Sequence, residues 1–376
     1  MSSVVIGGGL AGLSAALTLQ EAGESVELFE ASDAVGGRVR SDFIDGYILD
    51  RGFQLINSGY PELKRLGVIS EIDFCKADRS IDVVTPFGLT SIGDPRLHPL
   101  QGLRSPLGSL AEKIAVLKFV GEKPNGAISL RDALLASGTG DFYENLLKPF
   151  LRGVVLTELE NVDSAYGRDL IKSFIAGDSG LPSAGVGTLS EAIAARIETI
   201  HLNAPIDSLD QFAGKKVIVA TDAHTAAKLL NEKIDISFTD SYTWYHAIPA
   251  GLISSKRLRV TSAESPLVNS IAVSNVVSQY APEGKTLISS TSLMSLSDET
   301  ALSEISKFWG IAPSEFELVK RYEVRNSLPV FSPGRTGIAT AHVRGDIYRA
   351  GDYLTAGSQN GALLSGRLAA LESLTR

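Results

Sequence analysis

The chain has 376 residues, of which 44% are hydrophobic and 21% are charged, a globular composition that is sufficient for two domains. The 35 lysine and arginine residues against 43 aspartate and glutamate residues give a net charge of −8, which argues against nucleic-acid binding. The single cysteine, Cys75, excludes an internal disulfide and any site with several thiolate ligands. The five histidines lack metal-ligand spacing, so we expect no metal site.

Residues 1–20 carry no charged side chain, which superficially suggests a signal peptide or a membrane span. However, no basic residue precedes the apolar run, and glycines at positions 7, 8, 9 and 12 interrupt it. No other segment is long and apolar enough to span a bilayer. We therefore expect a cytoplasmic protein with at most peripheral membrane contact.

The N-terminal residues follow the order strand, glycine turn, helix. Residues 3–6 form a short apolar run, and an Ala/Leu-rich helix is expected over 13–22. Gly7 and Gly9 permit a tight turn and the close approach of a diphosphate, while Gly12 lets the helix lie against the strand. The amides of Leu10 and Ala11 at the helix start then face the phosphates.

A second expected strand, over 26–30, ends in Glu30, 18 positions after Gly12. An acid at this distance from the glycine turn accepts hydrogen bonds from the hydroxyls of an adenosine ribose. The combination of strand, turn, helix and acid therefore predicts a dinucleotide site. Because a carboxylate repels a 2′-phosphate, Glu30 disfavours NADP.

Residues 34–40 hold a second glycine pair, Gly36 and Gly37, followed by Arg38. A longer dinucleotide such as FAD needs backbone clearance and a cation for its diphosphate at this place. A surface turn with a solvated arginine explains the same residues equally well.

The C-terminal part reads as a strand over 347–352 that closes on Gly351 and Asp352, followed by a helix from position 358. The start of this helix, with Gly361 and Ala362, can stabilise negative charge on a reduced flavin, which a nicotinamide does not need. Asp352 is expected to accept hydrogen bonds from ribityl or phosphate-side hydroxyls. An ordinary helix that docks on the sheet gives the same pattern.

Together these segments resemble the flavin-containing amine oxidase superfamily, which includes phytoene desaturases and protoporphyrinogen oxidases. The resemblance rests on Gly-x-Gly-x-x-Gly at 7–12, Glu30, Gly-Gly-Arg at 36–38, Ala-Gly-Asp at 350–352 and the small residues of 358–366. Residues 181–189 and 216–221 resemble two further stretches of the family, so the likeness covers nearly the whole chain.

The resemblance implies an α/β fold with a discontinuous Rossmann-like FAD domain and an inserted α+β substrate domain. We assign residues 1–60, 181–240 and 325–376 to the FAD domain and 61–180 and 241–324 to the substrate domain. A capping box at Thr188 and Glu191 predicts a helix to 199, before a strand over 217–220 and a helix near 226–230.

The inserted segments have their own patterns. Short β-rich runs at 243–248, 258–261, 270–277 and 287–291 predict an antiparallel sheet that floors a substrate cavity, and 299–309 predicts a helix. Leucines and an isoleucine recur at steps of three and four from Leu100 to Leu117, which indicates an amphipathic helix. That helix either packs on its own domain or touches a membrane. His246 either faces the cavity or lies in the core.

The leading hypothesis is an FAD-dependent oxidoreductase that holds FAD non-covalently and removes a hydride from a C–H bond of a largely apolar small molecule. Oxygen, a quinone or another acceptor would take up the electrons. Gln54 is our candidate for lining the flavin pocket, and no catalytic residue is assigned. Cys75 lies outside both flavin motifs, which argues against covalent attachment.

Four alternatives remain: an amine oxidase, a redox-neutral isomerase that uses reduced FAD, a flavin-binding protein without chemistry, and an NAD-dependent dehydrogenase. In the superfamily that this sequence resembles, true amine oxidases carry a lysine near the flavin and usually an aromatic cage over the ring. No lysine falls in 242–248, and only Tyr353 is a cage candidate. The C-terminal motif is most similar to plant-type carotenoid desaturases, but the chain is short for that branch.

Overall fold

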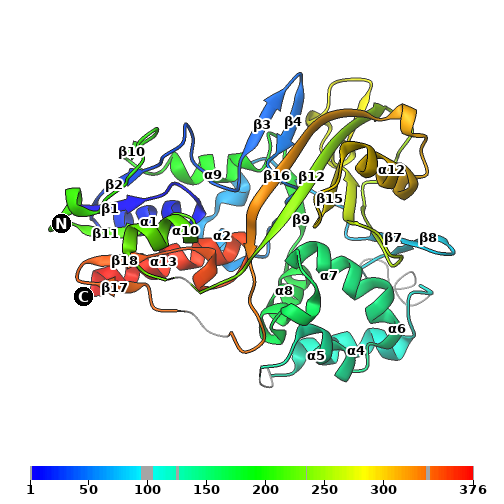
Figure 1. Ribbon diagram of the computed structural model, residues 1–376, viewed down its shortest axis with the longest axis horizontal. Coiled ribbons are helices and arrows are strands. Elements are labelled where there is room, and N and C mark those ends of the chain that lie inside the picture. Colours follow the sequence, from blue (N-terminus) through cyan, green and yellow to red (C-terminus); the bar gives the residue numbers. More distant parts are fainter. Residues whose placement is uncertain (1, 95–104, 124–126, 234, 336–338, 376) are drawn as a thin grey trace.

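The computed structural model describes residues 2–94, 105–123, 127–233, 235–335 and 339–375. Its two main sheets, one of six strands and one of seven, lie at different ends of the molecule (Figure 1). The N and C termini lie near each other beside the six-stranded sheet. None of the helices in the described part of the chain is long and apolar enough to cross a membrane.

The six-stranded sheet combines segments from both ends and the middle of the chain, in the order β10, β2, β1, β11, β18, β17. The strands from β10 to β18 pair in parallel, and β17 adds an antiparallel edge. This arrangement confirms the α/β class. The bounds are β1 Ser2–Ile6, β2 Ser25–Phe29, β10 Ile200–His201, β11 Lys216–Val219, β17 His342–Arg344 and β18 Ile347–Arg349.

Helices cover both faces of this sheet because alternate residues of β1 point in opposite directions. Val5 belongs to the core that includes Leu13 of α1, whereas Val4 and Ile6 pack with Leu230 of α10. Helix α13 lies along α1 (Figure 1). The helices around the sheet are α1 Leu10–Glu21, α2 Pro61–Leu66, α9 Gly187–Ala194, α10 Ala223–Leu230 and α13 Gln359–Thr375.

One local prediction in this region is wrong. Helix α9 begins at Gly187 and ends at Ala194, without the capping box that Thr188 and Glu191 predicted. The backbone turns earlier, at Gly185 with φ +92°, and the Thr188 hydroxyl donates to the Gly185 carbonyl instead. Asp222, in contrast, caps α10 by accepting bonds from two backbone amides.

The seven-stranded sheet has the order β16, β12, β15, β14, β13, β7, β8. It is antiparallel as predicted, except that β13 pairs in parallel with β7. The sequence patterns missed β7, β8 and the long β16, and residues 273–276 form a short helix rather than a strand. The bounds are β7 Ile81–Thr85, β8 Gly88–Ile92, β12 Phe238–Pro249, β13 Leu258–Thr261, β14 Leu267–Ala272, β15 Lys285–Ser292 and β16 Glu317–Pro329.

Helix α12 (Asp298–Trp309) covers one face of this sheet through Ile305 and Trp309, which confirms the helix predicted over 299–309. A separate group of helices packs around Phe119, Leu130 and Leu151 and lies away from the chain termini (Figure 1). Its members are α4 Leu110–Gly121, α5 Leu130–Ala136, α6 Gly140–Phe142, α7 Lys148–Val155 and α8 Ser164–Ala176.

The amphipathic helix predicted over 100–117 is wrong for residues 105–109, which are described and not helical, so Leu107 lies before the helix. Leu100 and Leu103 lie outside the described residues, and α4 begins at Leu110 behind a capping box of Ser109 and Glu112. The remaining elements are the hairpin β3 Ser41–Ile44 and β4 Tyr47–Asp50, the small sheet of β5 Ile56–Asn57, β6 Phe74–Lys76 and β9 Ser179–Pro182, and α11 Val273–Val276.

The division into FAD and substrate domains stays a prediction. Segments 1–60, 181–240 and 325–376 supply the strands of the six-stranded sheet, while 61–180 and 241–324 supply most of the other sheet and the helix group. Strand β16 runs through the predicted boundary at 324/325, and β12 through the one at 240/241.

A buried carboxylate connects these parts. Asp50, at the end of β4, accepts hydrogen bonds from the Ser41 hydroxyl (2.7 Å), the Val186 amide (3.0 Å) and the Tyr280 hydroxyl (3.0 Å). The hydroxyl of Tyr245, on β12, donates to the backbone carbonyl of Asp50. Burial disfavours the charged form and raises the pKa of Asp50 to about 6, although the three hydrogen bonds lower it in part.

This raised pKa predicts a pH dependence of stability. Because folded Asp50 binds its proton more tightly than the unfolded chain does, its contribution to the free energy of unfolding is present below pH 3.8 and lost as pH rises through about 6. The loss amounts to at most about 3 kcal/mol. Denaturant unfolding of wild type and Asp50→Asn between pH 4 and 7 measures it. Equal pH dependence in both proteins would contradict the assignment.

Candidate active site

The glycine turn after β1 is shaped by backbone contacts that exclude side chains. A Cβ at Gly7, whose φ is +106°, would lie 2.7 Å from the Ala220 carbonyl oxygen. A Cβ at Gly12 would lie 1.8 Å from the Gly7 oxygen, so this glycine lets α1 approach β1 as predicted. No side chain of the described residues caps the start of α1, where Gly9 is the N-cap residue. Its first amides therefore stay available to a negatively charged ligand.

Glu30 follows β2 and reaches back to this turn. One carboxylate oxygen accepts from the Gly8 amide (2.6 Å), and the other accepts from the amide (2.9 Å) and hydroxyl (2.6 Å) of Ser32. Each oxygen has two lone pairs, so capacity remains for at least one further donor. Glu30 lines the same cavity as Gly9. In the structure Glu30 therefore holds the glycine turn through Gly8, and its bond to a ribose stays a prediction.

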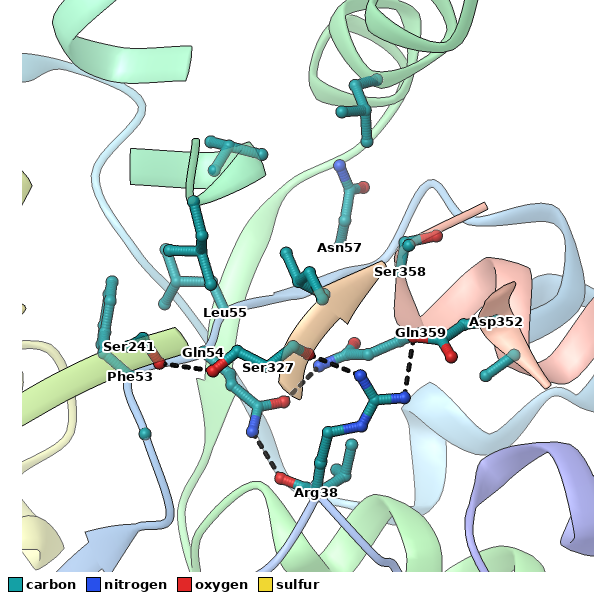
Figure 2. A pocket seen from close by; sticks show the side chains of 18 of the residues that line it. Arg38, Phe53, Gln54, Leu55, Asn57, Ser241, Ser327, Asp352, Ser358 and Gln359 are labelled. Carbon is teal, nitrogen blue, oxygen red and sulfur yellow. Dashed lines mark hydrogen bonds and ion pairs between the residues drawn. The ribbon is translucent and has the colours of Figure 1, made fainter. Parts of the chain in front are cut away.

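The second glycine pair joins the first loop to the C-terminal half of the chain. The Gly36 amide donates to the Gly8 carbonyl oxygen (2.8 Å). Arg38 then pairs with Asp352 at 2.7 Å and donates to the Ser327 carbonyl on β16 (Figure 2). Arg38 thus holds the C-terminal turn in place through the buried Asp352, and its contact with a diphosphate stays a prediction.

The turn before α13 brings further backbone into the site. The Gly351 amide donates to the Ser365 hydroxyl (2.9 Å), and the Ser358 hydroxyl accepts from the Gly361 amide (3.0 Å). A Cβ at Gly361 would lie 1.9 Å from the Ala356 oxygen. Gly361 therefore shapes the turn, while Ala362 reaches the cavity.

Two glutamines complete this end of the cavity. Gln54 donates to the Arg38 carbonyl (2.7 Å), and Gln359 donates to the Gln54 carboxamide oxygen (3.3 Å; Figure 2). The carboxamide oxygen of Gln359 is buried without a hydrogen-bond partner among the described residues. An orphaned acceptor at the wall of a cavity fits a ligand that carries N–H or O–H groups, such as a flavin. Sequence reasoning missed Gln359, although the amide-rich stretch 358–360 was its signal.

Twelve of the fourteen predicted cofactor residues line one cavity of about 1310 Å³, and only Gly12 and Gly361 stand behind its wall. This volume exceeds the roughly 300–1,000 Å³ of pockets for a drug-sized ligand. The lining residues are Gly7, Gly9, Leu10, Ala11, Glu30, Gly36, Gly37, Arg38, Gln54, Gly351, Asp352 and Ala362. The geometry brings them together; their binding of a cofactor stays a prediction.

The same cavity extends into an apolar chamber that sequence reasoning did not resolve. Its walls come from α4, α7 and α8 and from strands β7, β8, β13 and β14. No single residue signals such a chamber in the sequence, because its members lie on separate elements. They include Ile81, Ile92, Leu110, Ile114, Leu117, Phe142, Leu146, Phe150, Leu151, Val154, Leu170, Phe174, Leu258 and Ile271.

Three other candidates lie elsewhere. His246 is buried in the core against Phe316, and burial lowers its pKa to about 4, so it is neutral near pH 7. Tyr353 is buried beside Ala223 and is absent from the described cavity lining, which corrects its assignment to an aromatic cage. Cys75 lies on β6 and is half-buried.

Comparison with known proteins agrees with this arrangement. Residues 10–229 match the family model described as flavin-containing amine oxidoreductase, which covers more than half of the chain. The structure resembles that of an oxidoreductase from Methanosarcina mazei, with a TM-score of 0.78, 16% identity and full coverage of both chains. At 16% identity, the likeness to the Methanosarcina mazei structure concerns the fold alone.

Curated relatives match over parts of their length. The chain is 27% identical over 258 residues to lysine-specific histone demethylase 1B of Mus musculus, which covers 61% of this chain and 29% of that protein. It is 46% identical over 69 residues to putrescine oxidase of Kocuria rosea, a match that covers 18% of this chain and 14% of that protein. The matches thus span less than a third of either relative. By its family match, the chain belongs to the flavin-containing amine oxidoreductases.

Proposed function

We propose that the chain holds FAD non-covalently and removes a hydride from a C–H bond of a largely apolar small molecule. The observation that carries the proposal is the single cavity that joins the glycine turns to the apolar chamber. A cofactor at one end and a substrate at the other would meet inside it. A mostly apolar cavity wall also disfavours water near the reacting carbon.

The residues on the cavity wall suit the parts of FAD. The amides at the start of α1 would face the diphosphate, and Glu30 would accept from the adenosine ribose. Asp352, Gln54 and Gln359 would contact the flavin half. When bound, FAD supplies a two-electron acceptor for the hydride. The protein's task is then to orient the C–H bond, so it needs no acid/base pair.

Non-covalent binding is supported by the position of the only cysteine. Cys75 is absent from the described cavity lining, and its thiol contacts the Asp73 carbonyl. Burial and the nearby Asp73 charge raise the pKa of this thiol, which reduces its reactivity.

The division of the chain into an FAD domain and a substrate domain is part of the same proposal. The segments 1–60, 181–240 and 325–376 would form the FAD domain, and 61–180 and 241–324 the substrate domain. The cavity lies where the two meet, since its lining comes from all five segments.

Amine oxidation is the second candidate, because putrescine oxidase of Kocuria rosea is among the relatives. The chamber gives it less support. A cationic amine needs a free carboxylate, yet Asp78 pairs with Arg257 and Asp94 pairs with Arg79. Lys113, the lysine among the described lining residues, donates to the Ser105 carbonyl (2.9 Å).

Helix α4 supports access to the chamber from a membrane surface. Leu110, Ile114 and Leu117 line the cavity and are also 52%, 54% and 64% exposed. Their spacing of four and three places them on one face of α4. We propose that this face lies against lipid, so that an apolar substrate passes from the bilayer to the chamber.

Co-sedimentation with vesicles of phosphatidylcholine and phosphatidylglycerol at low salt tests the membrane contact. The wild type is expected to sediment with the vesicles, and Ile114→Ser with Leu117→Ser to stay in solution. Leu252→Ser is the matched control, because Leu252 is similarly exposed (49%) but is no part of the described cavity lining. Wild-type protein that stays in solution would refute the contact.

The cofactor prediction is tested by the absorption spectrum of the purified protein. Bands near about 375 and 450 nm, with FAD released into the supernatant by acid, are the expected result. Flavin that stays with the acid precipitate would contradict non-covalent binding. A colourless protein that takes up no added FAD would contradict the proposed function as a whole.

The ribose assignment is tested by Glu30→Ala with Glu27→Ala as the control. Glu27 lies on β2, three residues before Glu30, but it pairs with Lys215 and is absent from the described cavity lining. The first change should weaken FAD binding by about 1–3 kcal/mol through lost hydrogen bonds, and the second should leave it unchanged. Titration of the apoproteins with FAD, followed by flavin fluorescence, gives both dissociation constants. Equal constants for Glu30→Ala and wild type would rule out the role.

A further inference from the structure

A polar side chain on β14 lies among the apolar residues of the chamber. Asn269, on β14, lines the cavity and is only 4% exposed. Its carboxamide oxygen is buried and has no hydrogen-bond partner within the part of the chain that the structure describes. Buried polar atoms are nearly always paired, so an orphan on a cavity wall points to a partner that the chain itself does not supply.

The direction of this side chain is set by an irregularity in β14. The pairing of β14 with β15 shifts register between Leu267 and Asn269. Leu267 packs in the core cluster of Trp309, whereas Asn269 and Ile271 line the cavity. A strict two-residue alternation would have put all three side chains on one face of the sheet. The register shift therefore places Asn269 on the opposite face from Leu267.

Its neighbour on β14 serves as a comparison. The Ser270 hydroxyl points to the other face, where it accepts from the Trp309 indole (2.8 Å) and pairs with the Ser290 hydroxyl (2.7 Å). The sheet therefore satisfies a buried polar group on its closed face. The carboxamide oxygen of Asn269, on the open face, is left for a ligand.

The facing helix α7 packs closely on the nitrogen side of this carboxamide. Gly153, on α7, lines the cavity, and a Cβ there would lie 3.0 Å from the Asn269 carboxamide nitrogen. Val154 of the same helix and Leu258 of β13 line the cavity too. An unpaired acceptor in such apolar surroundings disfavours a pure hydrocarbon, which would bury the oxygen without compensation.

We propose that Asn269 accepts a hydrogen bond from a hydroxyl or N–H group of an otherwise apolar substrate. The preferred substrate class is then amphipathic molecules with such a donor, rather than hydrocarbons. This inference rests on the proposed function, because it places the substrate in the apolar chamber.

The test uses dodecanol and its methyl ether as probes of the flavin-loaded protein in isothermal titration calorimetry. Both have the same apolar chain, but only the alcohol can donate. Wild-type protein should bind the alcohol about three- to tenfold more tightly, as expected for one net hydrogen bond. Asn269→Leu, which removes the acceptor at similar volume, should abolish the preference, as should the smaller change Asn269→Ala.

Val154→Ala is the matched control, since it removes apolar contacts and leaves the acceptor in place. It should weaken both probes and keep their ratio. Equal affinities or an ether preference in wild type, or an alcohol preference that survives in the Asn269 variants, would overturn the inference while leaving the proposed function intact. Failure of wild type to bind either probe would overturn both, because the chamber would not take apolar molecules.

Discussion

The crossing of α1 and α13 is the contact on which the site depends. A Cβ at Gly366 of α13 would lie 1.9 Å from the carbonyl oxygen of Ala11 in α1, so the two backbones touch. Ser14 strengthens the crossing through a buried bond from its hydroxyl to the Leu363 carbonyl (2.7 Å). The glycine turn and the Gly351 turn lie almost 350 residues apart in sequence, and this crossing holds them at one cavity (Figure 1).

A second constraint joins the end of the cavity at the glycine turns to the seven-stranded sheet. Asp50 ties β4 to Tyr280 and Tyr245, while Arg38 reaches both Asp352 and β16. These polar contacts are buried or half-buried. They therefore fix the position of the glycine turns relative to the seven-stranded sheet. The apolar chamber can then vary in its lining without disturbing the glycine turns at the other end of the cavity. Under the proposal made above, substrate choice would depend on chamber residues such as Asn269.

The sequence predicted what local chemistry determines. The turn at Gly7, the helix over 299–309 and the strand over 258–261 each follow from periodicity or from glycine geometry within a few residues. Strand β16 was missed because its residues Glu317–Pro329 are mostly charged or polar and half-exposed, so only pairing with β12 makes it a strand. The Arg38–Asp352 pair and the chamber depend on distant elements, which no local pattern encodes.

The most direct measurement is the FAD dissociation constant of Gly366→Ala beside that of Gly121→Ala. The added methyl group of the first variant meets the α1 backbone, whereas that of the second meets open space. If the crossing builds the site, Gly366→Ala weakens FAD binding at least about tenfold and lowers the unfolding temperature, while Gly121→Ala changes neither. A folded Gly366→Ala protein with wild-type FAD affinity would contradict the account.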